Sequence, residues 1–439
     1  MTKIKPQIPK GFRDFLPPQK VLRQQVIDTI RKTFEVFGFE PLETPALEYA
    51  SILEGKYGEE GEKLIYKFED RGGRQVALRY DLTIPLSRVV AMYPSLPKPL
   101  KCYQISPVWR ADKPQKGRFR EFWQCDADIV GSESTLADAE VITTIYHVLK
   151  ALRFKQFTIR INNRKLLNGM AKAFAIEEDT IPSLLRIIDK LEHKGAHDIR
   201  DEMYEKGFQE AIVNNMLELF SINSGNKLNI KDLKNKFPDS PLVTEGAREL
   251  EEIFSYLSSM GVDPHCYRFD FTLARGLDYY TGPIFETTVD EPKIGSITGG
   301  GRYDTLIGMF SDTEFPATGS SFGLERVITV MEELHFFPSL STVTEVLMTV
   351  FSPEMQEHSL KVATELRSAG IKTELYCTSD KLKKQLMYAS NKGIPFVIII
   401  GPDECKDKKA ILRNMIKGDQ KLIAFDELVH TVRKEQSAL

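Results

Sequence analysis

The periodicity of hydrophobic residues changes along the 439-residue chain, and this change limits the possible folds more than any other feature. Residues 76–130 have the pattern of short strands joined by charged turns. Residues 164–257 have helical periodicity without evident strand alternation. Strand-like sequence returns at 268–273 and 284–289, and a helix is predicted from near Ser320 to about Leu334. The middle segment is therefore predicted to be a helical insertion.

The last hundred residues have a different pattern, in which strands alternate with helices. Strands are predicted at 346–351, 372–377 and 395–400, and helices at 353–368 and 380–392. This alternation is typical of a small α/β domain with a parallel or mixed sheet. Its start is predicted in the stretch 337–342, and the length of the chain agrees with two or three domains.

Composition excludes several classes of protein. The longest apolar runs, such as 396–400, are far shorter than the roughly 20 residues that span a bilayer, and no signal-peptide core is evident, so we expect no membrane and a cytoplasmic location. The five cysteines are scattered without a C-x-x-C pair, which argues against a disulfide framework and against zinc. The net charge of −3 means that an RNA partner would need a local basic face.

The segment 273–286 holds an unusual density of directional side chains. Arg275, Asp278, Tyr279 and Tyr280 lie within six residues, and glycines 276 and 282 flank the core of this cluster. One cation, one carboxylate and two phenols suit a small ligand that is partly anionic and partly ring-like. The usual phosphate-loop, dinucleotide, metalloprotease and serine-hydrolase motifs are not found, so a protein nucleophile has no evident candidate.

The segment 109–124 is rich in arginine. Pro114 and Gly117 predict a turn between two flanks that pair as an antiparallel hairpin. Alternation would place Arg118, Arg120, Phe122 and Gln124 on one face, with Arg110 nearby and with Asp126 and Asp128 following. Such a face could clamp phosphate and stack on a base. A solvated charged hairpin is the alternative, which the residues alone leave open.

Two further segments carry polar groups near glycine or a strand. Asp81 and Thr83 alternate onto one face of a predicted strand at 78–83, and a plain strand edge is the alternative. In the segment 317–326, Gly319 and Gly323 permit close approach of the backbone. Arg326 lies in the first turns of a predicted helix, whose amino end attracts anions. An ordinary helix start is the alternative there.

Taken in order, these segments resemble the histidyl-tRNA synthetase family, which belongs to the class II aminoacyl-tRNA synthetases. The helix and extended segment ending at residues 43–45 resemble the family's first motif, residues 109–124 the second and residues 319–326 the third. Residues 273–281 are similar to the signature of the histidine enzymes, and Gly300–Asp304 is also typical. The resemblance covers nearly the whole chain.

The resemblance implies an α+β catalytic domain on an antiparallel sheet in residues 1–163 and 259–336, with a helical insertion in residues 164–258. A small α/β anticodon-binding domain would follow in residues 343–439. It also implies a homodimer, a histidine–tRNA ligase activity, and L-histidine, ATP and tRNA(His) as substrates, with Mg²⁺ accompanying ATP. The lysines at 381–384 and 406–409 would then belong to an RNA-binding surface.

The family's residue roles carry over by the same resemblance. Histidine would be bound by Asp81, Leu82, Thr83, Gln124, Asp128, Tyr279 and Tyr280. ATP would be bound by Arg110, Asp112, Arg118, Phe122, Arg275 and Arg326, with Arg110 and Arg275 as the catalytic pair. Gln115 would face the tRNA acceptor end. The alternative is a catalytically silent relative of the kind that regulates ATP phosphoribosyltransferase. That alternative predicts that Arg275 and the last domain are missing, whereas this chain contains Arg275 and residues 345–439.

Overall fold

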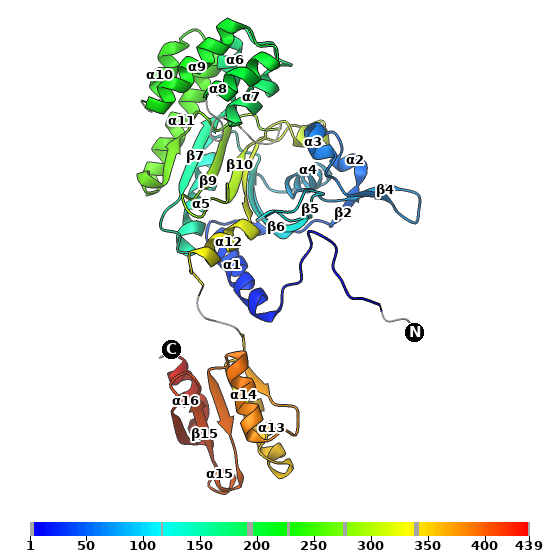
Figure 1. The fold of residues 1–439 in the computed structure, drawn as a ribbon, viewed down its shortest axis with the longest axis vertical. Helices are drawn as coiled ribbons and strands as arrows, with labels where there is room; N and C mark the ends of the chain where they lie inside the picture. The colour runs from blue at the N-terminus through cyan, green and yellow to red at the C-terminus, as the bar shows by residue number, and fades with distance from the viewer. Residues whose placement is uncertain are drawn as a thin grey trace. The chain divides into compact units, whose positions relative to one another are not determined.

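The computed structural model describes residues 4–115, 117–190, 196–225, 229–274, 279–337 and 342–437 (Figure 1). The chain divides into two compact units. One unit consists of Met1–Arg13 with Val26–Phe336, and the other of Asp14–Gln25 with Phe337–Leu439. Part of the predicted boundary at 337–342 lies outside the described residues.

An eight-stranded sheet is the frame of the larger unit, in the order β1-β5-β6-β11-β10-β9-β7-β8. The central pairs are antiparallel, and the two edge pairs β1–β5 and β7–β8 are parallel. The predicted antiparallel sheet is therefore confirmed. The strands are β1 (Glu40–Pro41), β5 (Leu100–Trp109), β6 (Glu121–Val130), β7 (Thr158–Asn163), β8 (Tyr267–Phe269), β9 (Pro283–Thr288), β10 (Thr298–Arg302) and β11 (Ala317–Gly323).

The helix predicted before the extended segment that ends at residues 43–45 is confirmed as α1 (Pro17–Val36), and Gly38 follows it with a φ of 76°. Val26, Ile30 and Phe34 recur at four-residue spacing and are buried, as one side of an amphipathic helix requires. The Phe34 ring packs against Tyr103 of β5 and Phe322 of β11, with ring centroids 5.8 and 6.0 Å apart. The C-terminal part of α1 is therefore fixed to the central strands.

The prediction of short strands throughout 76–130 is wrong in two respects. Strands β5 and β6 have ten residues each and pair along their whole length, from Leu100 opposite Val130 to Trp109 opposite Glu121. Residues Thr83–Met92 form a helix, α4, rather than a strand. Pro85 hides the helical signal, although proline is tolerated in a first helical turn because the N–H groups there have no intrahelical partner.

The helix predicted from Ser320 is also wrong at its start. Residues Ala317–Gly323 form strand β11, which pairs with β6 on one side and β10 on the other, and α12 (Leu324–Glu333) begins only afterwards. Small residues such as Gly319 and Ser320 have little intrinsic strand preference. Pairing on both sides decides their conformation, which is a tertiary effect that local sequence does not carry.

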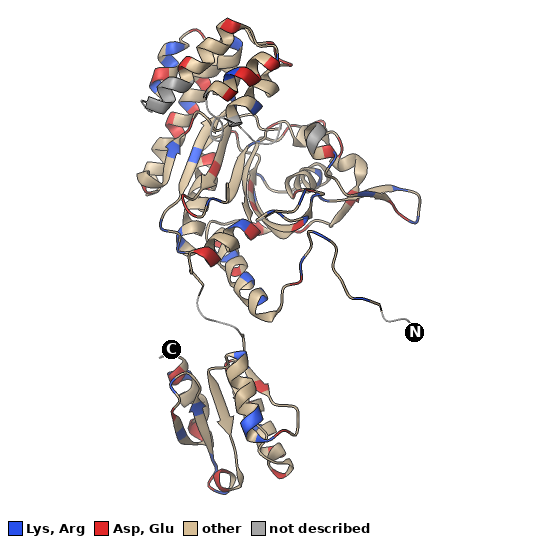
Figure 2. Ribbon diagram, viewed as in Figure 1, with Lys and Arg blue, Asp and Glu red and all other residues tan. Residues whose placement is uncertain are grey.

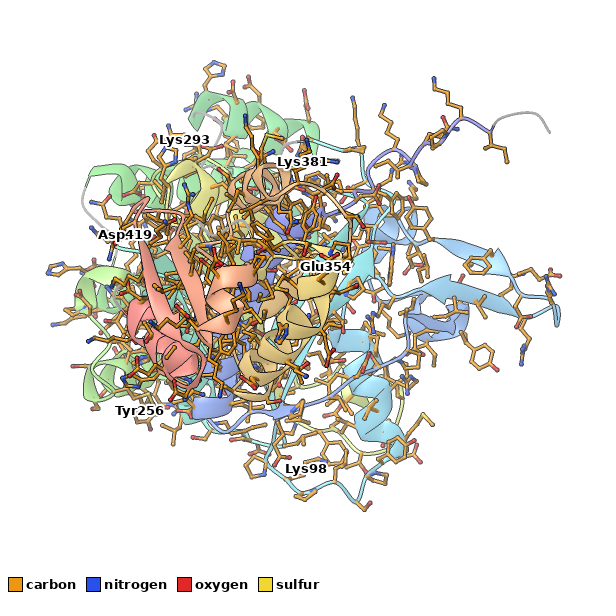
Figure 3. All side chains as sticks on the ribbon, turned by 90° about the horizontal axis from the view of Figure 1, so that it is seen from below. Lys98, Tyr256, Lys293, Glu354, Lys381 and Asp419 are labelled. Carbon is orange, nitrogen blue, oxygen red and sulfur yellow. The ribbon has the colours of Figure 1, made fainter. Side chains whose placement is uncertain are left out.

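A small sheet in the order β2-β4-β3 extends away from the large sheet in both ribbon views (Figures 1 and 3). It comprises β2 (Leu47–Tyr49), β3 (Lys67–Glu69) and β4 (Gln75–Leu78), with α2 (Ala50–Leu53) and α3 (Gly58–Glu62) between β2 and β3 in the chain. Leu78 ends β4, so Asp81 and Thr83 lie beyond the strand. The predicted strand across 78–83 is therefore wrong.

The predicted helical stretch between β7 and β8 is confirmed for the described residues. It contains α6 (Arg164–Ala173), α7 (Ile181–Lys190), α8 (Ala196–Glu205), α9 (Glu210–Gly225), α10 (Ile230–Lys236) and α11 (Pro241–Ser259). Acidic and basic residues are interspersed along these helices (Figure 2). Before this stretch, α5 (Thr135–Ala151) follows β6 and contacts α11.

The smaller unit contains a five-stranded mixed sheet in the order β13-β12-β14-β15-β16. Its strands are β12 (Val346–Met348), β13 (Thr373–Leu375), β14 (Phe396–Ile399), β15 (Lys409–Asn414) and β16 (Gln420–Ala424). Its helices are α13 (Gln356–Ser368), α14 (Leu382–Lys392), α15 (Pro402–Lys406) and α16 (Phe425–Gln436). Phe396 and Ile398 belong to one apolar cluster and Val397 and Ile399 to another, so β14 is buried on both faces. The predicted α/β alternation is confirmed.

Candidate active site

A pocket of about 610 Å³ lies in the larger unit. Its lining comes from the central strands β6, β9, β10 and β11, from the loop between β5 and β6, and from the segments around Tyr57 and Asp81. A smaller hollow of about 470 Å³, lined by Glu54, Glu62, Lys63, Ile65 and Lys67, lies beside β3. The larger pocket holds the concentrated polar chemistry, so it is the candidate site.

Most of the residues predicted from the sequence line this one pocket. They are Asp81, Thr83, Arg110, Asp112, Arg118, Phe122, Gln124, Asp128, Tyr279, Tyr280 and Arg326. Arg275, Asp278 and the two residues between them lie outside the described residues. Leu82 is fully buried, and its carbonyl accepts a hydrogen bond from Gln104 Nε2 at 3.0 Å. Gln115 bridges to Arg118 in the β5–β6 loop through paired backbone hydrogen bonds.

Asp81 is held at the amino end of α4. Its Oδ1 accepts from the backbone N–H of Ile84 and from the Tyr57 hydroxyl, each at 3.1 Å. Its other oxygen, Oδ2, is buried without a hydrogen-bond partner among the described residues. Burial raises the pKa of the Asp81 carboxyl, and the backbone hydrogen bond at Ile84 opposes that shift. One oxygen is thus fixed by the fold while the other remains available to a ligand donor.

Two more buried carboxyls follow on β6. Gln124, Asp126 and Asp128 alternate along the strand and line the pocket together. Burial raises the pKa of Asp128 to about 7, against the hydrogen bond that the Tyr303 hydroxyl donates to its Oδ1 at 2.6 Å. Burial, reinforced by the charge of Asp128, raises the pKa of Asp126 well above its ordinary value. The pocket therefore concentrates acceptor groups in a water-poor environment.

Gly319 makes room for Asp128. It lies opposite Asp128 in the pairing of β11 with β6, and a Cβ atom at this position would collide with the Asp128 carboxyl. The carboxylate is therefore enclosed between the Tyr303 hydroxyl and a glycine backbone. Because protein interiors are densely packed, this arrangement leaves the side chain of Asp128 little freedom to turn away from the pocket.

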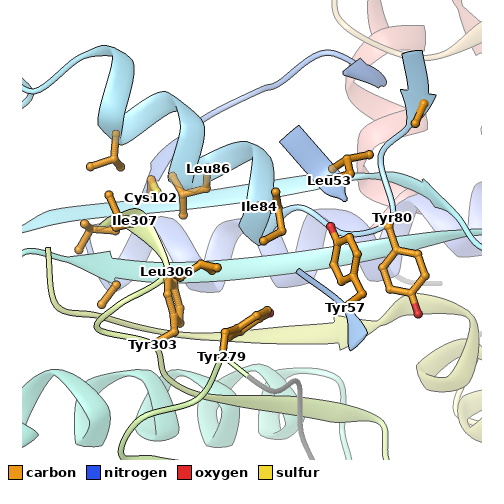
Figure 4. Close-up of a cluster of buried hydrophobic side chains, with 14 of the residues drawn as sticks. Leu53, Tyr57, Tyr80, Ile84, Leu86, Cys102, Tyr279, Tyr303, Leu306 and Ile307 are labelled. Carbon is orange, nitrogen blue, oxygen red and sulfur yellow. The ribbon is translucent and has the colours of Figure 1, made fainter. Parts of the chain in front are cut away.

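Aromatic rings that pack against one another form part of the pocket lining. The rings of Tyr57 and Tyr80 have centroids 4.3 Å apart, and Tyr279 lies 5.1 Å from Tyr280 and 5.9 Å from Tyr303. Tyr57, Tyr80, Tyr279 and Tyr303 belong to a buried cluster that also contains Ile84 and Leu306 (Figure 4). The site is therefore built on a packed core rather than on loops alone.

Arginines also line the pocket, among them Arg110 and Arg326. The Arg110 guanidinium lies 4.2 Å from the Tyr80 ring centroid and 5.1 Å from that of Phe122, and its Nε donates to the Tyr80 carbonyl at 3.1 Å. Arg326 on α12 donates to the Ser296 carbonyl at 2.6 Å. These contacts orient both guanidinium groups on rigid elements, which suits the recognition of phosphate oxygens.

Arg120 does not join the predicted face. Strand β6 begins at Glu121, so strand alternation does not extend to Arg118 and Arg120. Arg120 instead donates to the backbone carbonyls of Asp112 and Lys10, at 3.1 and 3.3 Å. The predicted hairpin is confirmed, and its arginines are divided between the pocket and the N-terminal segment.

Sequence reasoning missed three of the pocket's tyrosines, which lie at positions 57, 80 and 303. Tyr80 and Tyr303 lay inside the motifs 78–83 and 300–304, so the signal was present but unused. Tyr57 had no signal, because its contact with Asp81 joins residues 24 positions apart. Among the described residues, no group of three or more His, Cys, Asp or Glu side chains could hold a metal ion, and no helix could cross a membrane.

Comparison with known proteins identifies the family. A model of the histidyl-tRNA synthetase family matches residues 11–327, and an anticodon-binding-domain model matches residues 345–435. The chain is 42% identical to the histidine–tRNA ligase of Cytophaga hutchinsonii, over 97% of this chain and 99% of that protein. It is 40% identical to that of Bacteroides fragilis, over 98% of this chain and 99% of that protein.

A solved structure of histidyl-tRNA synthetase from Nostoc has a TM-score of 0.86 and 32% identity, covering 99% of this chain and 100% of that one. These matches confirm the predicted fold class and enzyme class. The chain belongs to the histidyl-tRNA synthetase family, and its function is that of a histidine–tRNA ligase.

Proposed function

We propose that the pocket joins L-histidine to ATP as histidyl-adenylate, with histidine beside the buried carboxyls at one end and ATP beside the arginines at the other. The carboxylate of histidine itself attacks the α-phosphorus, and pyrophosphate leaves. No protein nucleophile is needed, so catalysis consists of positioning the two substrates and stabilising the charge that develops between them. The presence of buried carboxyls and of several arginines in the lining of one pocket is the observation that carries the proposal.

At the histidine end, Asp81 and Thr83 hold the α-ammonium group, with the Leu82 backbone behind them. The unpartnered Oδ2 of Asp81 supports this role. Asp128 accepts a hydrogen bond from the imidazole, Gln124 contacts the amino group, and Tyr279 and Tyr280 line the side-chain pocket. A site whose buried acceptors need a ring N–H rejects apolar amino acids, because those acceptors would be left unpaired.

At the ATP end, Arg110 and Arg275 grip the α-phosphate and the attacking carboxylate. Arg118 and Arg326 hold the outer phosphates, adenine lies between Phe122 and Arg326, and Asp112 approaches the adenine edge. The orientation of Arg110 by Tyr80 supports this division of roles. Mg²⁺ accompanies ATP, since it is usually bound through substrate phosphates with only one or two carboxylates.

The terminal ribose hydroxyl of tRNA(His) then attacks the adenylate, with Gln115 facing the acceptor end. Residues 1–163 and 259–336 form the catalytic domain, 164–258 the helical insertion and 343–439 the anticodon-binding domain. The exposed lysines 381, 383, 406 and 408 support an RNA surface on the last domain, while Lys384 is paired with Asp380 at 2.8 Å. We place the reaction in the cytoplasm, where tRNA and ATP serve protein synthesis.

Esterification of tRNA tests this proposal. Purified protein supplied with ATP, labelled histidine and tRNA should transfer the label to acid-precipitable tRNA, and periodate oxidation of the tRNA's terminal ribose should prevent it. The silent alternative predicts histidine binding without transfer. The arginines that line the pocket favour the enzyme.

The active protein is proposed to be a homodimer. On the small sheet, Tyr49, Val76 and Phe68 are cross-strand partners and therefore share one face. Tyr49 and Phe68 remain 54% and 48% exposed, as is unusual for large apolar side chains on a sheet face outside an interface. Sedimentation at micromolar concentration should give a dimer, and Tyr49→Ser with Phe68→Ser should shift it toward monomer. A monomeric wild-type protein would refute the dimer.

A further inference from the structure

The N-terminal segment Lys10–Arg13 packs against the loop that joins β5 to β6. Gly11 adopts a φ of 88°, and its carbonyl accepts a hydrogen bond from the Arg120 N–H at 2.9 Å. A Cβ on Gly11 would lie 2.8 Å from Arg120 Cγ and 3.0 Å from Pro114 Cγ, so the segment lies directly on the loop. Arg120, which the pocket does not use, binds the Lys10 carbonyl as well.

Arg13 connects this loop to a second wall of the pocket. Its guanidinium lies 3.2 Å from the ring centroid of Phe119 on the loop. Its Nη2 also lies 3.5 Å from Oε1 of Glu325, in the first turn of α12. The other oxygen of Glu325 accepts from the Trp123 N–H of β6 at 2.9 Å. One arginine side chain therefore joins the β5–β6 loop, the start of α12 and, through Glu325, the start of β6.

Phe119 and Glu325, which Arg13 contacts, line the pocket, while Arg13 itself does not. Phe119 and Glu325 are lining residues, and each is a direct neighbour in sequence of an arginine assigned to the ATP phosphates, Arg118 and Arg326. Among the described residues, the lining begins at Tyr57, far along the chain from the N-terminal segment. Phe119 and Glu325 therefore give Arg13 an indirect route to a substrate in the pocket.

We propose that Lys10–Arg13 is a positioning clamp for ATP, in which Arg13 holds the β5–β6 loop and the start of α12 at the spacing that the nucleotide needs. This inference rests on the proposed assignment of ATP to the arginine-lined end. The Arg13 side chain is 32% exposed, but its guanidinium stacks on the Phe119 ring and the Glu325 carboxylate that it faces is only 4% exposed. The histidine end is held by a separate set of contacts, through Asp81, Tyr57 and Tyr303.

The clamp predicts that the two substrates respond differently to its loss. In histidine-dependent exchange of pyrophosphate into ATP, Arg13→Ala should raise the KM for ATP about tenfold and change the KM for histidine less than twofold. Arg13→Lys keeps a cation opposite Glu325 but loses the flat stack on Phe119, so it should give an intermediate KM for ATP. Arg248→Ala removes an exposed arginine paired with Glu252 on α11 and serves as the matched control, with both KM values unchanged.

The outcomes separate the clamp from the proposed function. If the wild-type protein shows no exchange, the assignment of the pocket fails first. If the wild type exchanges and Arg13→Ala keeps a normal KM for ATP, the clamp is wrong. Equal increases in both KM values would mean a general structural role and would also overturn it. If Arg13→Ala does not fold, Arg13→Lys must still raise the KM for ATP selectively.

Discussion

At the scale of single residues, the pocket contains buried carboxyl groups whose pKa values are raised because burial disfavours the charged form. Asp128 is buried beside Asp126, and Tyr303 and Gly319 confine it. Burying such a group as an anion carries a cost in stability, as is common for residues of functional sites. The sequence indicated Asp128 through its motif. It did not reveal the neighbours that change its proton affinity, because they come from other strands.

Asp128→Asn should raise the stability of the folded protein at high pH and lower its activity with histidine. The pKa of Asp128 is about 7 in the folded protein and roughly 3.9 in an unfolded chain, so the folded state binds the extra proton between these values. The free energy of unfolding therefore falls as pH rises from about 4 through 7, and asparagine removes that loss. The thermal midpoint of the variant should exceed the wild-type value at pH 8 and match it near pH 4.

The same variant should lose about 10- to 100-fold in kcat/KM for histidine at pH 8, since a hydrogen bond to a charged acceptor contributes about 1.5–3 kcal/mol. Differential scanning at both pH values and exchange kinetics measure the two effects. The exposed Asp312→Asn is the control and should change neither. An equal shift of the midpoint at pH 4 and pH 8 would contradict the assigned titration.

At the scale of elements, the hairpin of β5 and β6 was predictable because Pro114 and Gly117 mark its turn, whereas α4 and β11 were not. Pro85 obscured the start of α4, and the small residues of β11 form a strand because β6 and β10 pair with them on both sides. Local sequence carries turn chemistry and periodicity. Pairing across the sheet depends on residues nearly 200 positions apart, as for Asp128 and Gly319.

Gly319→Ala tests this account of β11. The added methyl group would collide with the Asp128 carboxyl, so we expect a loss of about 1–3 kcal/mol in the free energy of unfolding, as for overpacked sites, together with weaker histidine binding. Gly299→Ala on the neighbouring strand β10 is the matched control, because a Cβ there has open space. Denaturant titrations of both variants compare them, and equal stability of the two would contradict the packing described here.

At the scale of the whole molecule, one unit contains the pocket and the other contains the mixed sheet. We expect the first to form the adenylate and the second to bind RNA. Removing residues 345–439 should spare adenylate formation while reducing tRNA charging by at least about tenfold, because phosphate contacts supply much of the affinity for RNA. Parallel exchange and charging assays on the truncated protein measure both steps. Charging at the wild-type rate would contradict an RNA-binding role for the last domain.

The most direct test of the central claim is exchange of labelled pyrophosphate into ATP with purified protein. The account predicts exchange that depends on histidine, that leucine or phenylalanine does not support, and that falls by orders of magnitude in Arg275→Ala with the fold intact. Arg275 lies outside the described residues, so its role rests on the sequence motif. Absence of histidine-dependent exchange in the wild-type protein would contradict the account.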